Sequence, residues 1–197
     1  MEGAATGIGA ATVKTLSKHG AKVVLGDINK EAADALCKDY SGLSFVHCDV
    51  SKYDDIYNLF KTAHEEHGRI DHAVSCAGIF ETGNWFDPKL TIDTVKNDSG
   101  NLRTLDVNIL GTLHFARVAA VFLREGRQKD QDKTITLLSS VNAFRESPGL
   151  YIYQVSTLPA LADADLVTNI CYRPASTQYK ALCAPLERSY TDETVFE

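Results

Sequence analysis

The sequence predicts an α/β protein with a doubly wound parallel sheet and helices on both faces. Three observations support this prediction. Helical and strand-like segments alternate through the first 140 residues, as in βαβ units. A glycine cluster between Gly3 and Gly9 opens the first helix, and Asp27 ends the strand that follows it. Ligands of such folds bind at the carboxyl ends of the strands.

The first half of the chain gives a local signal for each element. The helix expected over 7–19 places four residues on one face and ends at a glycine; the strand at 21–27 is rich in β-branched residues. Asn29 can cap the next helix, and a strand at 43–50 follows. Ser51 is expected to open a helix that ends at Gly68. The expected buried face of the first helix consists of Ile8, Thr12, Val13 and Leu16.

The second half continues the alternation. Residues 71–78 form a strand-to-loop unit, 81–100 are a polar, insertion-like stretch, 102–123 form a long helix and 134–140 form a strand. The expected domain is residues 1–157. Residues 158–197 have little periodicity and are expected to form a separate tail.

Composition excludes several classes of function. The 197 residues carry a net charge of −6, which argues against a nucleic-acid partner. No apolar run approaches the ~18–20 residues of a membrane span, and the N-terminus does not resemble a signal peptide. Five cysteines without a CxxC pair indicate a reduced, cytoplasmic protein, and no Cys or His spacing fits a metal site.

The glycine cluster predicts a nucleotide site. Glycines let the backbone approach a pyrophosphate closely, and the helix N-terminus adds free N–H groups and partial positive charge. The expected contacts are Gly3, Thr6, Gly7, Ile8 and Gly9. A carboxylate at Asp27 can accept hydrogen bonds from ribose hydroxyls and would repel a 2′-phosphate, so we expect NAD to be preferred over NADP.

Motifs in this order resemble the short-chain dehydrogenase/reductase family, over roughly residues 2–156. The glycine loop is similar to that family's TGxxxGxG loop, although Glu2 replaces its Thr. Cys48-Asp49-Val50 is similar to its adenine-contacting step, and Ala77-Gly78 to the end of its Asn-Asn-Ala-Gly motif. Asn108, Ser140 and Tyr153 match its helix asparagine, catalytic serine and catalytic tyrosine, and the last two stand 13 positions apart.

The resemblance implies a Rossmann-like, NAD(P)-binding domain and hydride transfer between a nicotinamide and a small secondary alcohol or ketone. It assigns the general acid/base role to Tyr153, the hydrogen bond to the substrate oxygen to Ser140, and support of a proton relay to Asn108. The family's lysine would stand at Thr157, and Pro159 follows it closely. A catalytically impaired protein that binds a nucleotide or a partner is therefore the alternative.

The resemblance also sets expectations for the ends and the assembly of the chain. Only Met1 and Glu2 precede the glycine loop, so the first strand of the sheet is expected to be absent and the chain to be shortened at its front. The tail 158–197 diverges from the family's substrate region. The helix 102–123 is apolar on more than one face and could form a homodimer seam, as the equivalent helix does in that family.

Overall fold

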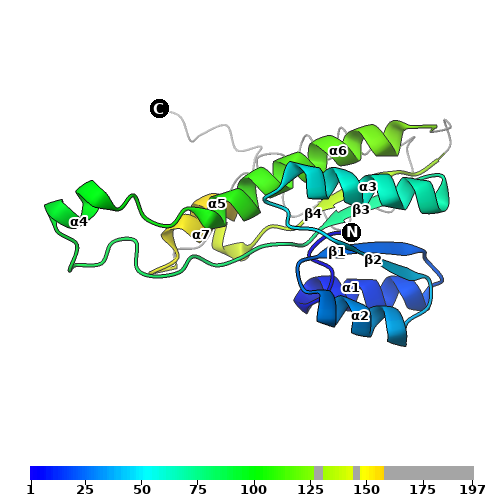
Figure 1. Ribbon diagram of the computed structural model, residues 1–197, viewed down its shortest axis with the longest axis horizontal. Helices are drawn as coiled ribbons and strands as arrows, with labels where there is room; N and C mark the ends of the chain where they lie inside the picture. Colours follow the sequence, from blue (N-terminus) through cyan, green and yellow to red (C-terminus); the bar gives the residue numbers. More distant parts are fainter. Residues whose placement is uncertain (127–130, 144–146, 158–197) are drawn as a thin grey trace, which may run out of the picture.

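The computed structural model describes residues 1–126, 131–143 and 147–157 (Figure 1). Pro159 and the predicted tail 158–197 lie outside the described residues. Strand β1 (Val23–Asp27) pairs in parallel with β2 (Leu43–His47), and β3 (His72–Ser75) pairs in parallel with β4 (Thr134–Leu137). In this register Asp27 lies opposite His47, and Ser75 opposite Leu137.

Met1 and Glu2 join the two strand pairs, although no strand precedes α1 among the described residues, as expected. Glu2 makes parallel bridges to both Gly26 and Ser75. Its N–H donates to the Val74 carbonyl at 3.0 Å, and its own carbonyl accepts from the Cys76 N–H at 3.1 Å. Two residues therefore take the place of a central strand at the carboxyl end of the sheet.

The helices cover both faces of the sheet, which confirms the doubly wound prediction (Figure 1). Helices α1 (Gly7–Lys18) and α2 (Lys30–Asp39) pack against β1 and β2 on one face. Helices α3 (Tyr53–His67) and α6 (Thr112–Arg124) pack against each other and cover the other face. The ring of Phe60 in α3 lies 5.0 Å from that of Phe115 in α6, at the centre of this layer.

Two details of the predicted helices are wrong. Ile8 is 67% exposed, and the buried face of α1 is instead formed by Gly9, Ala10, Val13 and Ser17. Ser51 does not open α3, which begins at Tyr53, because the Ser51 hydroxyl and N–H both donate to Asp49 in the preceding turn. Two other helix ends follow the prediction: Asn29 Oδ1 accepts from the Ala32 N–H, and Gly68 caps the C-terminus of α3 directly after His67.

The predicted helix 102–123 is continuous from Arg103 to Arg124 but changes its winding. A short α5 (Arg103–Leu105) leads into a π-helical segment, η1 (Asp106–Gly111), before α6. By length and composition this 22-residue stretch, which contains an 18-residue window with a mean hydropathy of 1.3, could cross a membrane, contrary to the expectation that no run is long enough. Length and composition are weak evidence for a membrane span, because a helix of a protein core can have both. Phe115, Val118 and Ala119 of this helix are buried in the core.

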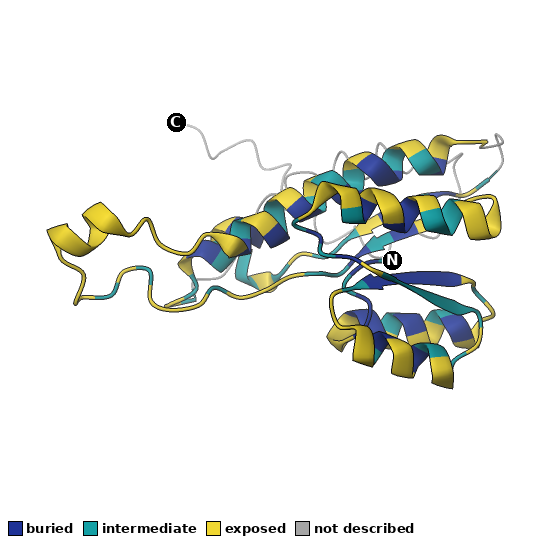
Figure 2. Cartoon of the chain, viewed as in Figure 1, coloured by how far each residue is buried: buried dark blue, intermediate teal, exposed yellow. Residues whose placement is uncertain are grey.

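Residues between β3 and α5 form an arm that projects from the body (Figures 1 and 2). Its helix α4 (Ile92–Asn97) has no buried residue. At the base of the arm, Asn101 Nδ2 donates to Thr82 Oγ1 at 3.2 Å, and the Trp85 ring lies against Gly100. The predicted polar insertion thus leaves the body and returns to it, and its two ends contact each other.

Two short helical elements follow β4 near its carboxyl end. A single 3₁₀ turn, η2 (Val141–Ala143), follows β4, and α7 (Tyr151–Thr157) lies against α5 and η1. A hollow of about 1150 Å³ lies elsewhere, against the amino-terminal ends of β1 and β3, with Leu16 and Phe60 among its lining residues. The predicted site residues follow the opposite, carboxyl ends of the strands.

Candidate active site

The glycine loop is closely packed where it meets the sheet and open above α1. A methyl group on Gly3 would lie 2.2 Å from the backbone nitrogen of Ala77, and one on Gly9 would lie 1.9 Å from the Gly3 carbonyl oxygen. Gly7, at a φ of +52°, has no atom near its missing Cβ. The α1 N-cap, Thr6, makes no side-chain cap, and both Thr6 and Ile8 are exposed. The loop therefore presents an uncovered helix N-terminus.

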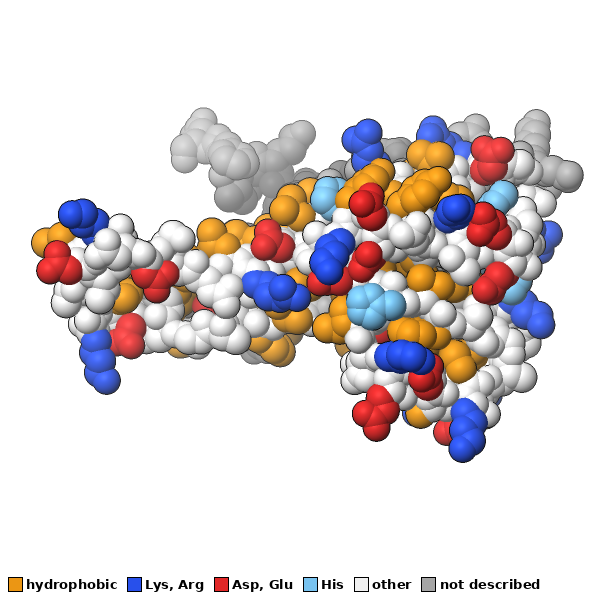
Figure 3. Space-filling view, viewed as in Figure 1, with side chains coloured by type: hydrophobic (Ala, Val, Ile, Leu, Met, Phe, Trp, Pro, Cys, Tyr) orange, Lys and Arg blue, Asp and Glu red, His pale blue; other side chains and the backbone are white. Residues whose placement is uncertain are grey.

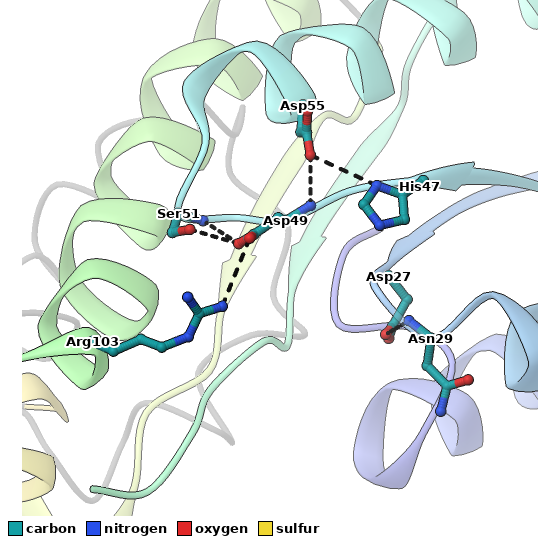
Figure 4. A network of polar contacts seen from close by, with 7 residues as sticks. All are labelled: Asp27, Asn29, His47, Asp49, Ser51, Asp55 and Arg103. Atoms are coloured by element: carbon teal, nitrogen blue, oxygen red, sulfur yellow. Dashed lines mark hydrogen bonds and ion pairs between the residues drawn. The ribbon is translucent and has the colours of Figure 1, made fainter. Parts of the chain in front are cut away.

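Asp27 holds the glycine loop and the turn into α2 (Figure 4). Its Oδ2 accepts from the Ala5 N–H at 2.8 Å, and its Oδ1 accepts from the Asn29 N–H at 2.9 Å. A carboxylate has about four acceptor positions, so each oxygen can accept a further bond from a ligand hydroxyl. The predicted ribose-binding carboxylate thus also fixes the shape of its own site.

Asp49 is committed to a polar network at the end of β2 (Figure 4). Its Oδ1 accepts from the Ser51 hydroxyl at 2.6 Å, and its Oδ2 lies 3.7 Å from Arg103 Nη2. The hydrogen bonds from Ser51 lower the pKa of the Asp49 carboxyl. The Asp49 N–H donates to Asp55 Oδ2, which lies 3.8 Å from His47 Nδ1. The sequence analysis missed Arg103, whose guanidinium ties the start of α5 to this turn.

Val50 and the loop after β3 complete the predicted cofactor side. Val50 is 6% exposed and packs against Gly111 of η1, so it offers a ligand little surface. The Ala77 N–H donates to Glu2 Oε2 at 2.9 Å, and Gly78 is exposed. Burial raises the pKa of the Glu2 carboxyl, which is 1% exposed. The only signal for this contact in the sequence was an acidic residue at the family's Thr position.

Asn108 connects the loop after β3 to α7. Its Oδ1 accepts from the Ile79 N–H at 2.9 Å. Its Nδ2 donates to the Ile79 carbonyl at 3.0 Å and to Ser156 Oγ at 2.8 Å. Asn108 lies in the π-helical segment, a distortion that often occurs at functional sites.

Asn142 connects the turn of Ser140 to α7, the helix that carries Tyr153. The Asn142 N–H donates to Ser140 Oγ at 3.2 Å, while its carbonyl accepts from Gln154 Nε2 at 3.2 Å. Gln154 directly follows Tyr153 in α7. The turn that carries the serine is therefore bonded to the helix that carries the tyrosine.

Thr157, at the position of the family's lysine, faces its own helix. The side chain is buried, and its hydroxyl donates to the Gln154 carbonyl at 3.0 Å. The Thr157 carbonyl accepts from Ser139 Oγ at 2.9 Å. The position thus fixes the end of α7 to the end of β4 and supplies no positive charge.

Comparisons with known proteins agree with this arrangement. A family model described as enoyl-(acyl carrier protein) reductase matches residues 3–158. The chain is 35% identical over 160 residues to short chain aldehyde dehydrogenase 1 of Euphorbia lathyris, covering 79% of this chain and 52% of that protein. It is 42% identical over 122 residues to mitochondrial borneol dehydrogenase of Lavandula x intermedia, covering 60% and 44%. The chain thus spans about half the length of these curated relatives.

A third relative is matched over more of its length, and solved structures show the same fold. The chain is 30% identical over 186 residues to 3-hydroxyacyl-CoA dehydrogenase type-2 of Drosophila melanogaster, covering 93% of this chain and 71% of that protein. A 3-ketoacyl-(acyl-carrier-protein) reductase of Brucella melitensis, complexed with NADH, superimposes with a TM-score of 0.72 at 24% identity, covering 86% of this chain and 69% of the other. The chain belongs to the short-chain dehydrogenase/reductase family.

Proposed function

We propose that the protein is an NAD-dependent oxidoreductase that acts on a small secondary alcohol or ketone. The observation that carries the proposal is the set of bonds around α7. Asn108 reaches this helix through Ser156, and the Ser140 turn reaches it through Gln154. Relatives named borneol dehydrogenase and tropinone reductase-like 1 support an alcohol or ketone substrate.

The residues at the carboxyl edge of the sheet fit a dinucleotide. The open N-terminus of α1 offers N–H groups to a pyrophosphate, and the space at Gly7 leaves room for it. Asp27 would accept from ribose hydroxyls, and Gly78 would border the nicotinamide half. We further propose that Asp49, Val50 and Ala77 border the adenosine half. When bound, NAD supplies the acceptor for a hydride.

The side chains around Tyr153 would handle the proton. In alcohol oxidation Tyr153, as the phenolate, would accept the O–H proton of the substrate, and in ketone reduction its phenol would donate a proton to the substrate oxygen. The Ser140 hydroxyl would donate to the substrate oxygen and orient it. A free phenol has a pKa near 10, so a tyrosine base without a nearby cation works best at alkaline pH. The test is NADH formation with a panel of secondary alcohols between pH 6 and 10, compared with Tyr153→Phe.

We infer a preference for NAD over NADP from Asp27. Its carboxylate stands at the end of β1, and Ile28 and Asn29, rather than a basic residue, follow it in the turn into α2. Two charges near 4 Å repel by about 1–4 kcal/mol between bulk water and a protein surface. Calorimetry should show tighter binding of NADH than of NADPH, and Asp27→Asn should narrow the difference. Tighter NADPH binding by the unaltered protein would reject the inference.

A nucleotide-binding protein without catalysis is the second candidate. Thr157 favours it, because this side chain bonds its own helix where the family places a lysine. A thermal melt with and without NAD, combined with the turnover assay, separates the two candidates. Stabilisation by NAD without turnover would support the second.

We also propose that the chain forms a homodimer through the helix of residues 102–123. Leu110, Leu113 and Val121 are each more than 40% exposed along it, and hydrophobic side chains gather over α6 in Figure 3. These residues lie outside the stripe that packs on the sheet. Sedimentation should find a dimer at tens of micromolar, and a monomer of 21.6 kDa would reject this assembly.

The location of the protein is the last part of the proposal. We propose the cytoplasm, since the cysteine usage predicts a reducing compartment. The Lavandula relative is named as a mitochondrial protein. Fractionation of cells that express the full chain, probed with an antibody, would distinguish the two compartments.

A further inference from the structure

We propose that Glu81 is a positioning residue that sets the placement of Tyr153, an inference that rests on the role proposed for this tyrosine. The Glu81 carboxylate reaches the start of α7 from the base of the arm. Its Oε1 accepts from the Tyr151 N–H at 3.1 Å, and its Oε2 accepts from the Tyr153 N–H at 2.7 Å. One side chain thus binds two backbone groups of the helix that carries the proposed acid/base.

Helix α7 needs an acceptor from elsewhere in the chain. The first N–H groups of any helix lack partners within it, and a side-chain oxygen at the N-cap usually supplies one. The residue before α7 is Leu150, which has no such oxygen, and the first bond along the helix runs from the Gln154 N–H to the Leu150 carbonyl. Glu81 fills this role, and its negative charge also suits the positive end of the helix.

The neighbours of Glu81 act on the same two proposed catalytic residues. Ile79 is held on both of its backbone groups by Asn108. The ring of Phe80 lies 4.3 Å from the ring of Tyr153. Three consecutive residues therefore link Asn108, the ring of Tyr153 and the backbone of Tyr153. This linkage sets the phenol relative to Asn108, which a helix cap alone would not do.

A second pair of aromatic rings joins the arm to α7. The ring of Phe86 lies 4.7 Å from that of Tyr151, edge to face. This contact holds the arm against Tyr151, at the start of α7, without the Glu81 side chain. A change at Glu81 therefore leaves the arm attached, which lets its effect on Tyr153 be measured by itself.

The test compares Glu81→Ala and Glu81→Gln with Asp87→Asn. Asp87 is a matched control because its carboxylate accepts a backbone N–H, that of Lys89, within the same arm. A misplacement of about 1 Å can cost roughly a hundredfold in rate. We expect Glu81→Ala to lower kcat at least about tenfold while the Kd for NAD changes less than about twofold. Glu81→Gln keeps one acceptor oxygen and should recover part of the loss; Asp87→Asn should match the unaltered protein.

Hydrogen exchange of the peptide that contains residues 150–157 provides a second readout that needs no turnover. Exchange should rise in Glu81→Ala and not in Asp87→Asn. If the unaltered protein shows no activity, the proposed function fails, and the ring NMR signals of Tyr153 decide the inference: a shift in Glu81→Ala alone supports it. Equal behaviour of Glu81→Ala and Asp87→Asn overturns it. Faster exchange with an unchanged kcat in an active enzyme also overturns it, since Glu81 would then be only a cap.

Discussion

Replacing Gly9 by alanine would place a methyl group 1.9 Å from the carbonyl oxygen of Gly3. The next nearest atoms, at 2.8 and 3.0 Å, also belong to the backbone, so no side-chain rotation can relieve the conflict. The loop itself is held, because the Ala5 N–H donates to Asp27 and the Ala4 N–H to the Gly26 carbonyl. Overpacking a tight site costs about 1–3 kcal/mol. We expect Gly9→Ala to reduce the free energy of unfolding by about 3 kcal/mol, at the upper end of this range, which lowers Tm by roughly 6–12 °C.

Two other glycines separate this steric effect from backbone strain. Gly7 and Gly20 both have positive φ, and neither has an atom within 4 Å of its missing Cβ. Alanine at either position therefore adds only left-handed strain, roughly 1–2 kcal/mol. The Gly7 methyl would stand on the open face of the nucleotide loop, whereas Gly20 lies at the far end of α1. Gly7→Ala should weaken NAD binding and Gly20→Ala should not.

The assay pairs thermal melts followed by circular dichroism with calorimetric titration of NAD. The expected order of Tm loss is Gly9→Ala first, with Gly7→Ala and Gly20→Ala smaller and equal. A Gly9→Ala protein that melts within about 2 °C of the unaltered chain would refute the packing argument. A Gly7→Ala protein that binds NAD as tightly as Gly20→Ala would refute the placement of the nucleotide.

Three further changes test other parts of the site. Because hydrogen bonds from Ser51 lower the pKa of Asp49, this carboxylate stabilises the fold above its ordinary pKa of 3.8 and loses that effect as the pH falls. Asp49→Asn should lower Tm at pH 7 but hardly below pH 3, as melts across this range would show. Burial raises the pKa of the Glu2 carboxyl above its ordinary value of 4.5, so the ionised side chain destabilises the folded protein as the pH rises. Glu2→Gln should therefore raise Tm at pH 8 and leave Tm unchanged at pH 4 in the same melts. Thr157→Lys should raise NADH formation at pH 7 relative to pH 10, because it adds a cation one turn after Tyr153; an unchanged pH profile would show that this position does not tune the phenol.

The residues of the proposed nucleotide site stand close together in the sequence, so their pattern can be recognised there. Gly3 stands in the loop before α1, Gly9 in α1 and Asp27 at the end of β1, and the spacing of the two glycines reflects the close packing of this loop. The close approach of Gly3 to the Ala77 backbone was not visible in the sequence, although the glycine itself was singled out. The one error in this region, Ile8, arose because helical periodicity does not show that the first turn of α1 projects beyond the sheet.

The proposed catalytic side depends on contacts between distant segments, which a sequence pattern cannot show. Glu81 and Tyr153 are separated by 72 residues, and nothing in the polar stretch 81–100 distinguishes this carboxylate from its neighbours. The π-helical winding around Asn108 has no periodic signal, since one extra residue per turn is absorbed inside a long apolar helix. Met1 and Glu2 were too short to register as a strand, although their backbone groups bridge the sheet.

The hydrogen bonds of Asn108 limit what its side chain can contribute to a proton relay. An asparagine amide has two N–H donors, and both are used, one by the Ile79 carbonyl and one by Ser156 Oγ. Its Oδ1 accepts from the Ile79 N–H and has one lone pair left. A relay water could therefore donate to this oxygen but could receive no hydrogen bond from the amide. Ser156 in turn donates to the Tyr153 carbonyl at 2.7 Å, so the chain of bonds from Asn108 ends on the backbone of the tyrosine rather than on its phenol. In this geometry the side chain of Asn108 acts first on the position of α7, by the same route of backbone contacts that Glu81 uses from the other end of the helix.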